Sequence, residues 1–289
     1  MQDQATELRK LVSRSADDSG SDDSEQPTRL LLAGAKGGVG TTMLSLNLAI
    51  AIQRLGFKTL LVEANPTGGD VVNICDLTIN GCLQDVLGSH QDWISAATAG
   101  PGGISVVPTT TALDETGTQQ RQHLSRRLES GLLFFDVVLI DVGCCPITAK
   151  AVAPHCNDCI VVTTPDHVAL KRAYQMMKSI AFAKPQVWVN KYTNARIAGE
   201  VEARLKASCA RFLEFQLNVL PAIQMNPMME TTLTNDRLAM DASPGSLSES
   251  IRDVARALTD KNIQSHPCTK LQTTSCKDER NHFNSLAKA

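Results

Sequence analysis

The stretch Leu30-Leu31-Leu32-Ala33-Gly34-Ala35-Lys36-Gly37-Gly38-Val39-Gly40-Thr41-Thr42 decides the fold of this chain. An apolar run of strand length leads into a glycine-rich turn, and apolar residues at helical spacing follow at Leu44, Leu48, Ile52 and Leu55, up to Gly56. Glycines let successive backbone N–H groups point into one concavity, and the N-terminus of a helix adds partial positive charge. The stretch therefore predicts a strand, a phosphate-binding loop and a helix.

The loop departs from the G-x-x-x-x-G-K-[ST] pattern of phosphate loops at two positions. Gly40 and Thr42 fit the pattern, but Ala35 takes the place of the first glycine and Thr41 that of the lysine. The backbone cradle is therefore predicted to bind a polyphosphate without its usual cation.

Composition limits the class of protein. The chain has 289 residues, 43% of them hydrophobic, which is enough for one sizeable core. A net charge of -2 gives no general attraction to nucleic acid, so we do not expect nucleic-acid binding. We find no secretion signal, no apolar run of ~18 residues and no direct membrane anchor in the tail, which predicts a cytoplasmic protein.

The nine cysteines are an odd number in a chain without a secretion signal, so we expect reduced thiols. Two pairs, Cys144 with Cys145 and Cys156 with Cys159, flank predicted strands and could converge on a metal ion. We favour the simpler interpretation that they act as small buried hydrophobic residues.

Strands and helices alternate along the chain. Further apolar runs of strand length lie at residues 58–64, 104–107, 134–141, 158–164, 186–190 and 219–220, and helical patterns at residues 76–87, 119–129, 165–181, 228–239 and 247–258. This order predicts an α/β fold with a doubly wound, mostly parallel sheet, helices on both faces and a ligand at the carboxyl ends of the strands.

The chain is expected to contain one folded domain. We assign residues 28–260 to a nucleotide-binding domain and residues 1–12 to a short amphipathic docking helix. Residues 13–27 are acidic and too polar to bury a core, and residues 261–289 are polar, so both are predicted to be disordered.

One carboxylate is well placed for a metal ion. The apolar run at residues 134–141 delivers Asp141 to the sheet edge beside the phosphate loop. There it suits second-shell binding of Mg²⁺, with the Thr42 hydroxyl as a direct ligand.

The loop Lys36-Gly37-Gly38-Val39-Gly40 resembles the deviant P-loop of the MinD/ParA ATPases. The resemblance implies a P-loop NTPase fold, with ATP bound by residues 37–42, and an ATP-favoured homodimer in which Lys36 reaches the partner's nucleotide. It also implies that Asn190, with Pro221 on the following strand, binds the adenine.

A second family element is altered in this chain. The family's Asp-x-Asp element, whose second aspartate helps to orient the attacking water, is represented by Glu63 and Asn65. Asn65 can hydrogen-bond a water but cannot accept its proton. With Thr41 in the lysine position as well, we expect a protein that binds ATP and hydrolyses it very slowly or not at all.

The N-terminal run Asp3-Gln4-Ala5-Thr6-Glu7-Leu8-Arg9 resembles the DQAxxLR motif of the FlhG family, also called FleN or YlxH. These proteins are MinD-like regulators of flagellar number, and in them the motif activates the GTPase FlhF. The resemblance implies that residues 1–12 contact an FlhF-type GTPase through Asp3, Gln4, Leu8 and Arg9. Gln4 could orient the attacking water, whereas Arg9 could stabilise charge or simply dock.

Three alternatives remain open. CpaE/TadZ-like and cellulose-synthesis-associated MinD homologues also lack the loop lysine, although many carry a receiver-like domain where this chain has only residues 1–27. An active ATPase could use Lys36 in place of the missing lysine. A Rossmann dehydrogenase is disfavoured because the loop lacks G-x-G-x-x-G spacing.

Overall fold

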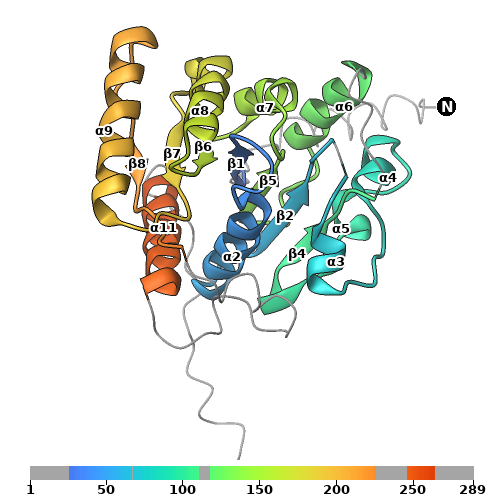
Figure 1. Ribbon diagram of the computed structural model, residues 1–289. Coiled ribbons are helices and arrows are strands. Elements are labelled where there is room, and N and C mark those ends of the chain that lie inside the picture. The colour runs from blue at the N-terminus through green and yellow to red at the C-terminus, as the bar shows by residue number, and fades with distance from the viewer. Residues whose placement is uncertain (1–25, 67, 111–117, 226–245, 264–289) are drawn as a thin grey trace, which may run out of the picture.

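The computed structural model describes residues 26–66, 68–110, 118–225 and 246–263 (Figure 1). Its centre is an eight-stranded sheet with the order β3-β4-β2-β5-β1-β6-β7-β8, in which β3 alone runs antiparallel to its neighbour. The strands are β1 (Thr28–Gly34), β2 (Thr59–Glu63), β3 (Thr98–Ala99), β4 (Ser105–Val107), β5 (Val137–Asp141), β6 (Asp158–Thr163), β7 (Gln186–Val189) and β8 (Val219–Leu220). The prediction of a doubly wound, mostly parallel sheet is confirmed.

Helices cover both faces of this sheet. They are α2 (Thr41–Arg54), α3 (Val71–Cys75), α4 (Leu83–Leu87), α5 (Trp93–Ala96), α6 (Thr118–Glu129), α7 (Pro146–Val152), α8 (His167–Ser179), α9 (Ala195–Phe212) and α11 (Ser246–Ile263), with short 3-10 turns at Pro101–Gly103, Ala153–His155 and Ala181–Ala183. Helices α2 and α11 pack together on one face, and α6, α7 and α8 follow one another on the other (Figure 1).

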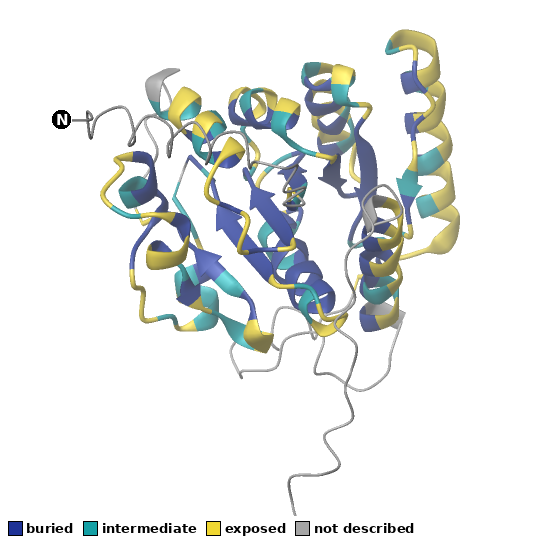
Figure 2. Cartoon of the chain, turned by 180° about the vertical axis from the view of Figure 1, so that it is seen from behind, coloured by how far each residue is buried: buried dark blue, intermediate teal, exposed yellow. Residues whose placement is uncertain are grey.

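The middle strands are buried on both sides (Figure 2). Every residue of β2, β5, β6 and β7 is buried, which explains why these strands are almost continuously apolar in the sequence. Three charged residues lie in these strands. Glu63 and Asp141 come last in β2 and β5, at the carboxyl edge where the phosphate loop also lies, whereas Asp158 begins β6 at the opposite edge. Two buried carboxylates thus lie beside the phosphate loop, while the one at the amino edge pairs with Lys261.

Some predicted boundaries are wrong. The helical region predicted at residues 76–87 is interrupted: α3 ends before Asp76, whose φ is 48°, and α4 begins only at Leu83. Between them, Asn80 bonds to Thr98 and Ala97 across a turn, so the backbone leaves the helical path. The strand predicted from residue 134 begins at Val137, because Phe134 lies in an exposed turn.

Other elements were not anticipated or cannot be compared. Helices α7 and α9 occupy stretches to which the sequence analysis gave no element. The helix predicted at residues 228–239 and the docking helix at residues 1–12 lie outside the described residues, as do most of the predicted linker and tail. In the part of the chain that the structure describes, no helix combines the length and apolar character needed to cross a membrane.

The cysteine pairs do not converge. Cys144 and Cys145 follow the carboxyl end of β5, whereas Cys156 and Cys159 lie at the amino end of β6, on the opposite edge. Burial raises the pKa of the Cys159 thiol to about 12, so it stays protonated. Among the described residues no group of three or more histidine, cysteine or acidic side chains could hold a metal ion, so the four-thiolate alternative is wrong.

Candidate functional site

The phosphate loop joins β1 to α2 in the conformation that its glycines permit. Gly38 and Gly40 have φ values of 80° and 91°, in the left-handed region that disfavours residues with a Cβ. Gly40 caps α2, and no side chain bonds to the first N–H groups of the helix. A Cβ on Gly37 or Gly38 would meet nothing within 4 Å, so the loop opens outward. The loop therefore presents backbone donors to an anion.

Thr41 does not replace the missing lysine. Its side chain is buried, and its hydroxyl packs against Gly34, where even one added carbon on the glycine would overlap it. The side chain thus points inward beneath the loop. The position that carries a phosphate-binding cation in other P-loops contributes none here.

Lys36 is held by its own chain. Its Nζ lies 3.4 Å from Oδ2 of Asp166, which precedes α8. Asp166 also accepts hydrogen bonds from the Thr164 hydroxyl at 2.6 Å and the Ala169 N–H at 2.9 Å. These contacts, the Thr164 bond first, lower the pKa of Asp166. Sequence reasoning treated Asp166 only as the start of a helix and missed its pairing with Lys36.

Asn190 supports the phosphate loop from β7. Its Nδ2 donates to the Val39 carbonyl at 2.8 Å, and a Cβ on Gly40 would lie only 2.6 Å from the same nitrogen. The next residue, Lys191, donates from Nζ to the Gly38 carbonyl at 3.2 Å. Asn190 therefore holds the loop in shape, a role that the sequence analysis did not anticipate. Its role in adenine binding stays a prediction.

Pro221 lies just beyond the short edge strand β8. It is exposed, and its carbonyl accepts a hydrogen bond from Trp188 Nε1 at 2.9 Å, which ties the end of β8 to β7. Its adenine role also stays a prediction.

Asp141 combines full burial with an unused oxygen. Its Oδ1 accepts the Gly143 N–H at 2.9 Å, but Oδ2 has no partner in hydrogen-bonding geometry among the described residues. The Thr42 hydroxyl lies close enough to lower the pKa of the carboxyl, yet burial outweighs this effect and the pKa is raised overall. An orphaned carboxylate oxygen beside a threonine hydroxyl fits a Mg²⁺ site, because Mg²⁺ keeps waters that such an oxygen can bind.

Glu63 is Asp141's neighbour across the sheet and has a different environment. Its Oε1 accepts the N–H groups of Asp70 at 2.8 Å and Val71 at 3.1 Å, and its Oε2 accepts that of Thr109 at 3.3 Å. Burial still raises the pKa of this carboxyl. Glu63 thus holds the segments at Asp70–Val71 and at Thr109 in place and does not face a ligand. The sequence did not reveal this role.

The structure brings the predicted residues of the domain to one edge of the sheet. Lys36, residues 37–42, Asp141 and Asn190 surround the start of α2, and Asn65 packs against Gly143 in the turn after β5. The predicted catalytic role of Asn65 stays a prediction. The partner-binding residues Asp3, Gln4, Leu8 and Arg9 lie outside the described residues.

Comparisons with known proteins identify the family of this chain and several relatives. The model of the family described as AAA domain matches residues 29–193. Antiactivator FleN of Pseudomonas aeruginosa is 25% identical over 233 residues, covering 75% of this chain and 80% of FleN. Flagellum site-determining protein YlxH of Helicobacter pylori is 22% identical over 274 residues, covering 90% and 92% of the two chains.

Solved structures share the fold. The septum site-determining protein MinD of Pyrococcus horikoshii, complexed with Mg-ADP, superposes with a TM-score of 0.65 at 18% identity, covering 82% of this chain and 97% of MinD. A ParA family ATPase from Chlorobium tepidum gives a TM-score of 0.64 at 22% identity, covering 79% and 98%. This chain therefore belongs to the AAA domain family, shares the fold of the MinD and ParA structures, and has FleN and YlxH among its relatives.

Proposed function

We propose that this protein is a MinD-like, nucleotide-binding regulator of flagellar number or placement. It binds ATP with Mg²⁺, hydrolyses it slowly or not at all, and stimulates an FlhF-type GTPase through residues 1–12. The names of FleN and YlxH, an antiactivator and a flagellum site-determining protein, support the flagellar part. We place it in the cytoplasm, with recruitment to a cell pole or membrane through partners.

The environment of Thr41 carries the proposal of binding without efficient hydrolysis. The backbone donors of the loop are in place, but Thr41 is buried beneath them. A charge-assisted hydrogen bond contributes about 1.5 to 3 kcal/mol, so its loss weakens ATP binding by roughly one to two decades. Cations placed on a transferring phosphoryl group matter more for the rate, by about 10³ to 10⁵. We therefore expect ATP to bind and its hydrolysis to be very slow or absent.

Residues of this chain would also hold the metal ion. Thr42 would supply a direct oxygen ligand, and the free Oδ2 of Asp141 would bind a metal-bound water. Bound Mg²⁺ supplies positive charge that neutralises the phosphates. Asn65, lacking a carboxylate, would orient a water without taking its proton.

The first experiment measures ATP binding by calorimetry and ATP hydrolysis by phosphate release. We expect measurable Mg²⁺-dependent binding with little turnover in the wild-type protein. Thr41→Lys should bind ATP about 10- to 100-fold more tightly, because it restores the loop cation. Thr41→Ala is the matched control and should bind like wild type. Wild-type turnover equal to that of an intact MinD-type enzyme would contradict the proposal and favour an active ATPase that uses Lys36.

Dimerisation is tested by mass measurement with and without ATP. In the proposed dimer Lys36 leaves Asp166 and contacts the nucleotide bound to the partner. Lys36→Ala should therefore abolish the ATP-dependent dimer. Lys206, which pairs with Glu202 on α9, provides the control substitution Lys206→Ala. Equal dimerisation of both variants would exclude Lys36 from the interface.

The partner is tested with a peptide of residues 1–20 and the FlhF-type GTPase of the same genome. The native peptide should raise the rate of GTP hydrolysis, and a Gln4→Ala peptide should not, because Gln4 orients the attacking water. No stimulation by the native peptide would favour a CpaE/TadZ-like role in placing pili or secretion machinery.

A further inference from the structure

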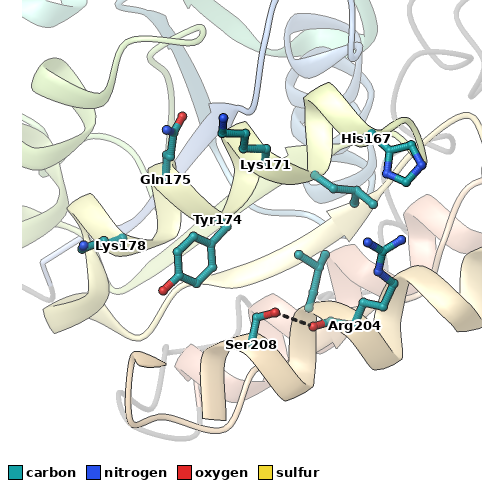
Figure 3. A pocket seen from close by; sticks show the side chains of 9 residues that line it. His167, Lys171, Tyr174, Gln175, Lys178, Arg204 and Ser208 are labelled. Atoms are coloured by element: carbon teal, nitrogen blue, oxygen red, sulfur yellow. Dashed lines mark hydrogen bonds between the residues drawn. The ribbon is translucent and has the colours of Figure 1, made fainter. Parts of the chain in front are cut away.

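A basic groove lies between α8 and α9, away from the phosphate loop (Figure 3). Its volume is about 500 Å³, and its basic side chains are His167, Lys171 and Lys178 from α8 and Arg204 from α9. Tyr174 points from α8 towards Ser208 on α9, and Arg204 reaches towards His167 (Figure 3). Among the described residues, none with an acidic side chain lines the groove.

The cations of the groove are unpaired in the described part of the chain. Lys171, Lys178 and Arg204 are exposed, and no carboxylate of the described residues lies within 4.0 Å of them. Two other basic residues of α9 are paired with carboxylates, since Arg196 lies 3.0 Å from Glu200 and Lys206 lies 2.6 Å from Glu202. A concentration of unneutralised positive charge in a hollow favours an anionic ligand.

The shape and the remaining lining favour a peptide over a small ion. Leu170 and Leu205 contribute apolar surface beside the cations, and the groove runs along two helices. An extended acidic segment can place carboxylates on the cations while its backbone and short side chains cover the apolar floor.

We propose that residues 17–25 of this same chain occupy the α8–α9 groove. This segment carries five carboxylates in nine residues, Asp17, Asp18, Asp22, Asp23 and Glu25. It complements the groove in charge, and the rest of the sequence contains no comparable acidic run. The inference does not depend on the proposed function.

The connectivity of the fold brings the segment within reach. Strand β1 begins at Thr28, at the amino edge of the sheet, directly beside β6. Helix α8 runs from the carboxyl end of β6 back to the amino end of β7, so Lys178 in its last turn lies at that same edge. Nine extended residues span roughly 30 Å. The tether also gives the segment a millimolar effective concentration, which lets individually weak ion pairs act together.

The consequence is a switch that any strongly anionic partner can operate. With the segment in the groove, residues 1–12 are held beside α8 and α9. An acidic ligand that competes for Lys171, Lys178 and Arg204 releases them.

Zero-length cross-linking of the full-length protein tests the contact. A carbodiimide joins carboxylates to lysines in direct contact, and a mixture of ¹⁴N- and ¹⁵N-labelled protein separates links within a chain from links between chains. We expect links from residues 17–25 to Lys171 or Lys178 within one chain, lost at about 0.5 M salt, where charges are screened. Lys206, which pairs with Glu202, should form no link to residues 17–25. Links found only between chains, or none to the groove, would overturn the proposal.

Proteolysis gives an independent readout on folded variants. The triple variant Lys171→Glu, Lys178→Glu and Arg204→Glu changes only exposed side chains. Cleavage before Asp17 to Asp23 by endoproteinase Asp-N should be about fivefold faster in it than in wild type, because cleavage follows the population of the open segment. Lys206→Glu should leave the rate unchanged. An unchanged rate in the triple variant, with loss of binding to a single-stranded oligonucleotide, would assign the groove to nucleic acid and overturn the proposal.

Discussion

Glu63 and Asp141 end neighbouring strands in direct register, yet the chain treats the two carboxylates differently. Both are buried, and burial raises the pKa of each. Glu63 accepts three backbone hydrogen bonds, whereas Asp141 keeps one oxygen without a partner among the described residues. The hydrogen bonds of Glu63 are thus made within the fold, whereas Asp141 has an oxygen that can bind a ligand.

The difference shows that burial alone does not identify a ligand-binding carboxylate. Two acidic side chains at the same depth and the same sheet edge look equivalent in the sequence, but only their hydrogen-bond partners show which one can act on something else. Four predictions test this difference between carboxylates, in order of decreasing expected effect.

Removing Glu63 should have the largest effect. Glu63→Ala leaves the N–H groups of Asp70, Val71 and Thr109 without their acceptor, so the free energy of unfolding should fall by about 3 kcal/mol. Glu63→Gln keeps one acceptor oxygen and should cost about 1 kcal/mol. Urea unfolding measures both, and equal losses in the two variants would show that the hydrogen bonds are not the cause.

The second-largest effect should come from Mg-ADP, which is expected to depend on Asp141. At about 100-fold excess over its Kd it should stabilise the wild-type protein by about 2.7 kcal/mol. In Asp141→Asn, Mg²⁺ affinity should fall by about 10- to 100-fold, since the residue that holds metal-bound water has lost its charge. Thermal unfolding with ADP and either Mg²⁺ or EDTA provides the measurement and its control. The same Mg²⁺ dependence in both proteins would remove Asp141 from the metal site.

Without ligand, Asp141→Asn should have the opposite effect and increase stability. Because the pKa of Asp141 is raised in the folded protein, that state binds its proton more tightly than the unfolded chain does. Its contribution to stability is therefore complete below the unfolded pKa of about 4 and is lost as pH rises through the folded pKa. We expect Asp141→Asn to raise the free energy of unfolding by about 1 kcal/mol at pH 8, and by less at pH 5. A gain that does not change with pH would contradict this account.

Asp166 should give the smallest change in stability. It pairs with Lys36 near the surface, and such pairs contribute about 0 to 1 kcal/mol. Asp166→Asn removes the charge but keeps a capping side chain for α8, so the free energy of unfolding should change by less than about 0.5 kcal/mol. Asp166→Ala also loses the cap and should cost about 1 kcal/mol. A large loss in Asp166→Asn would make the ion pair a structural element rather than a restraint on Lys36.

The sequence predicted the parts of this site that depend on local pattern. The apolar run before Gly34, the glycines of the loop and the strand ending at Asp141 each carry their own signal, so the loop, the sheet and the position of Asp141 follow from them. Helix α9 was missed although its buried residues Val201, Leu205 and Cys209 recur at helical spacing. Helix α7 has only seven residues, too few to show a helical period.

Pairings across the sheet could not be predicted in the same way. The contacts of Lys36 with Asp166 and of Asn190 with Val39 join residues that are far apart in the chain. A helix-capping aspartate and an asparagine at a strand end both have common local roles, and only the tertiary structure shows their further contacts. The environment of Glu63 likewise depends on loops whose course no local pattern fixes.

The strand order has a consequence for synthesis of the protein on the ribosome. Strand β1 is made first but occupies the middle of the sheet, between β5 and β6. It therefore has no partner strand until Asp141 at the end of β5 has been added, and its second partner is complete only at Thr163. The phosphate loop lacks its Asn190 support for longer still. At 5 to 20 residues per second, this delay is on the order of ten seconds. During that interval the apolar run Leu30 to Ala33 has no neighbouring strand. Nucleotide binding can stabilise the nascent chain only after the residues that complete the loop have been added.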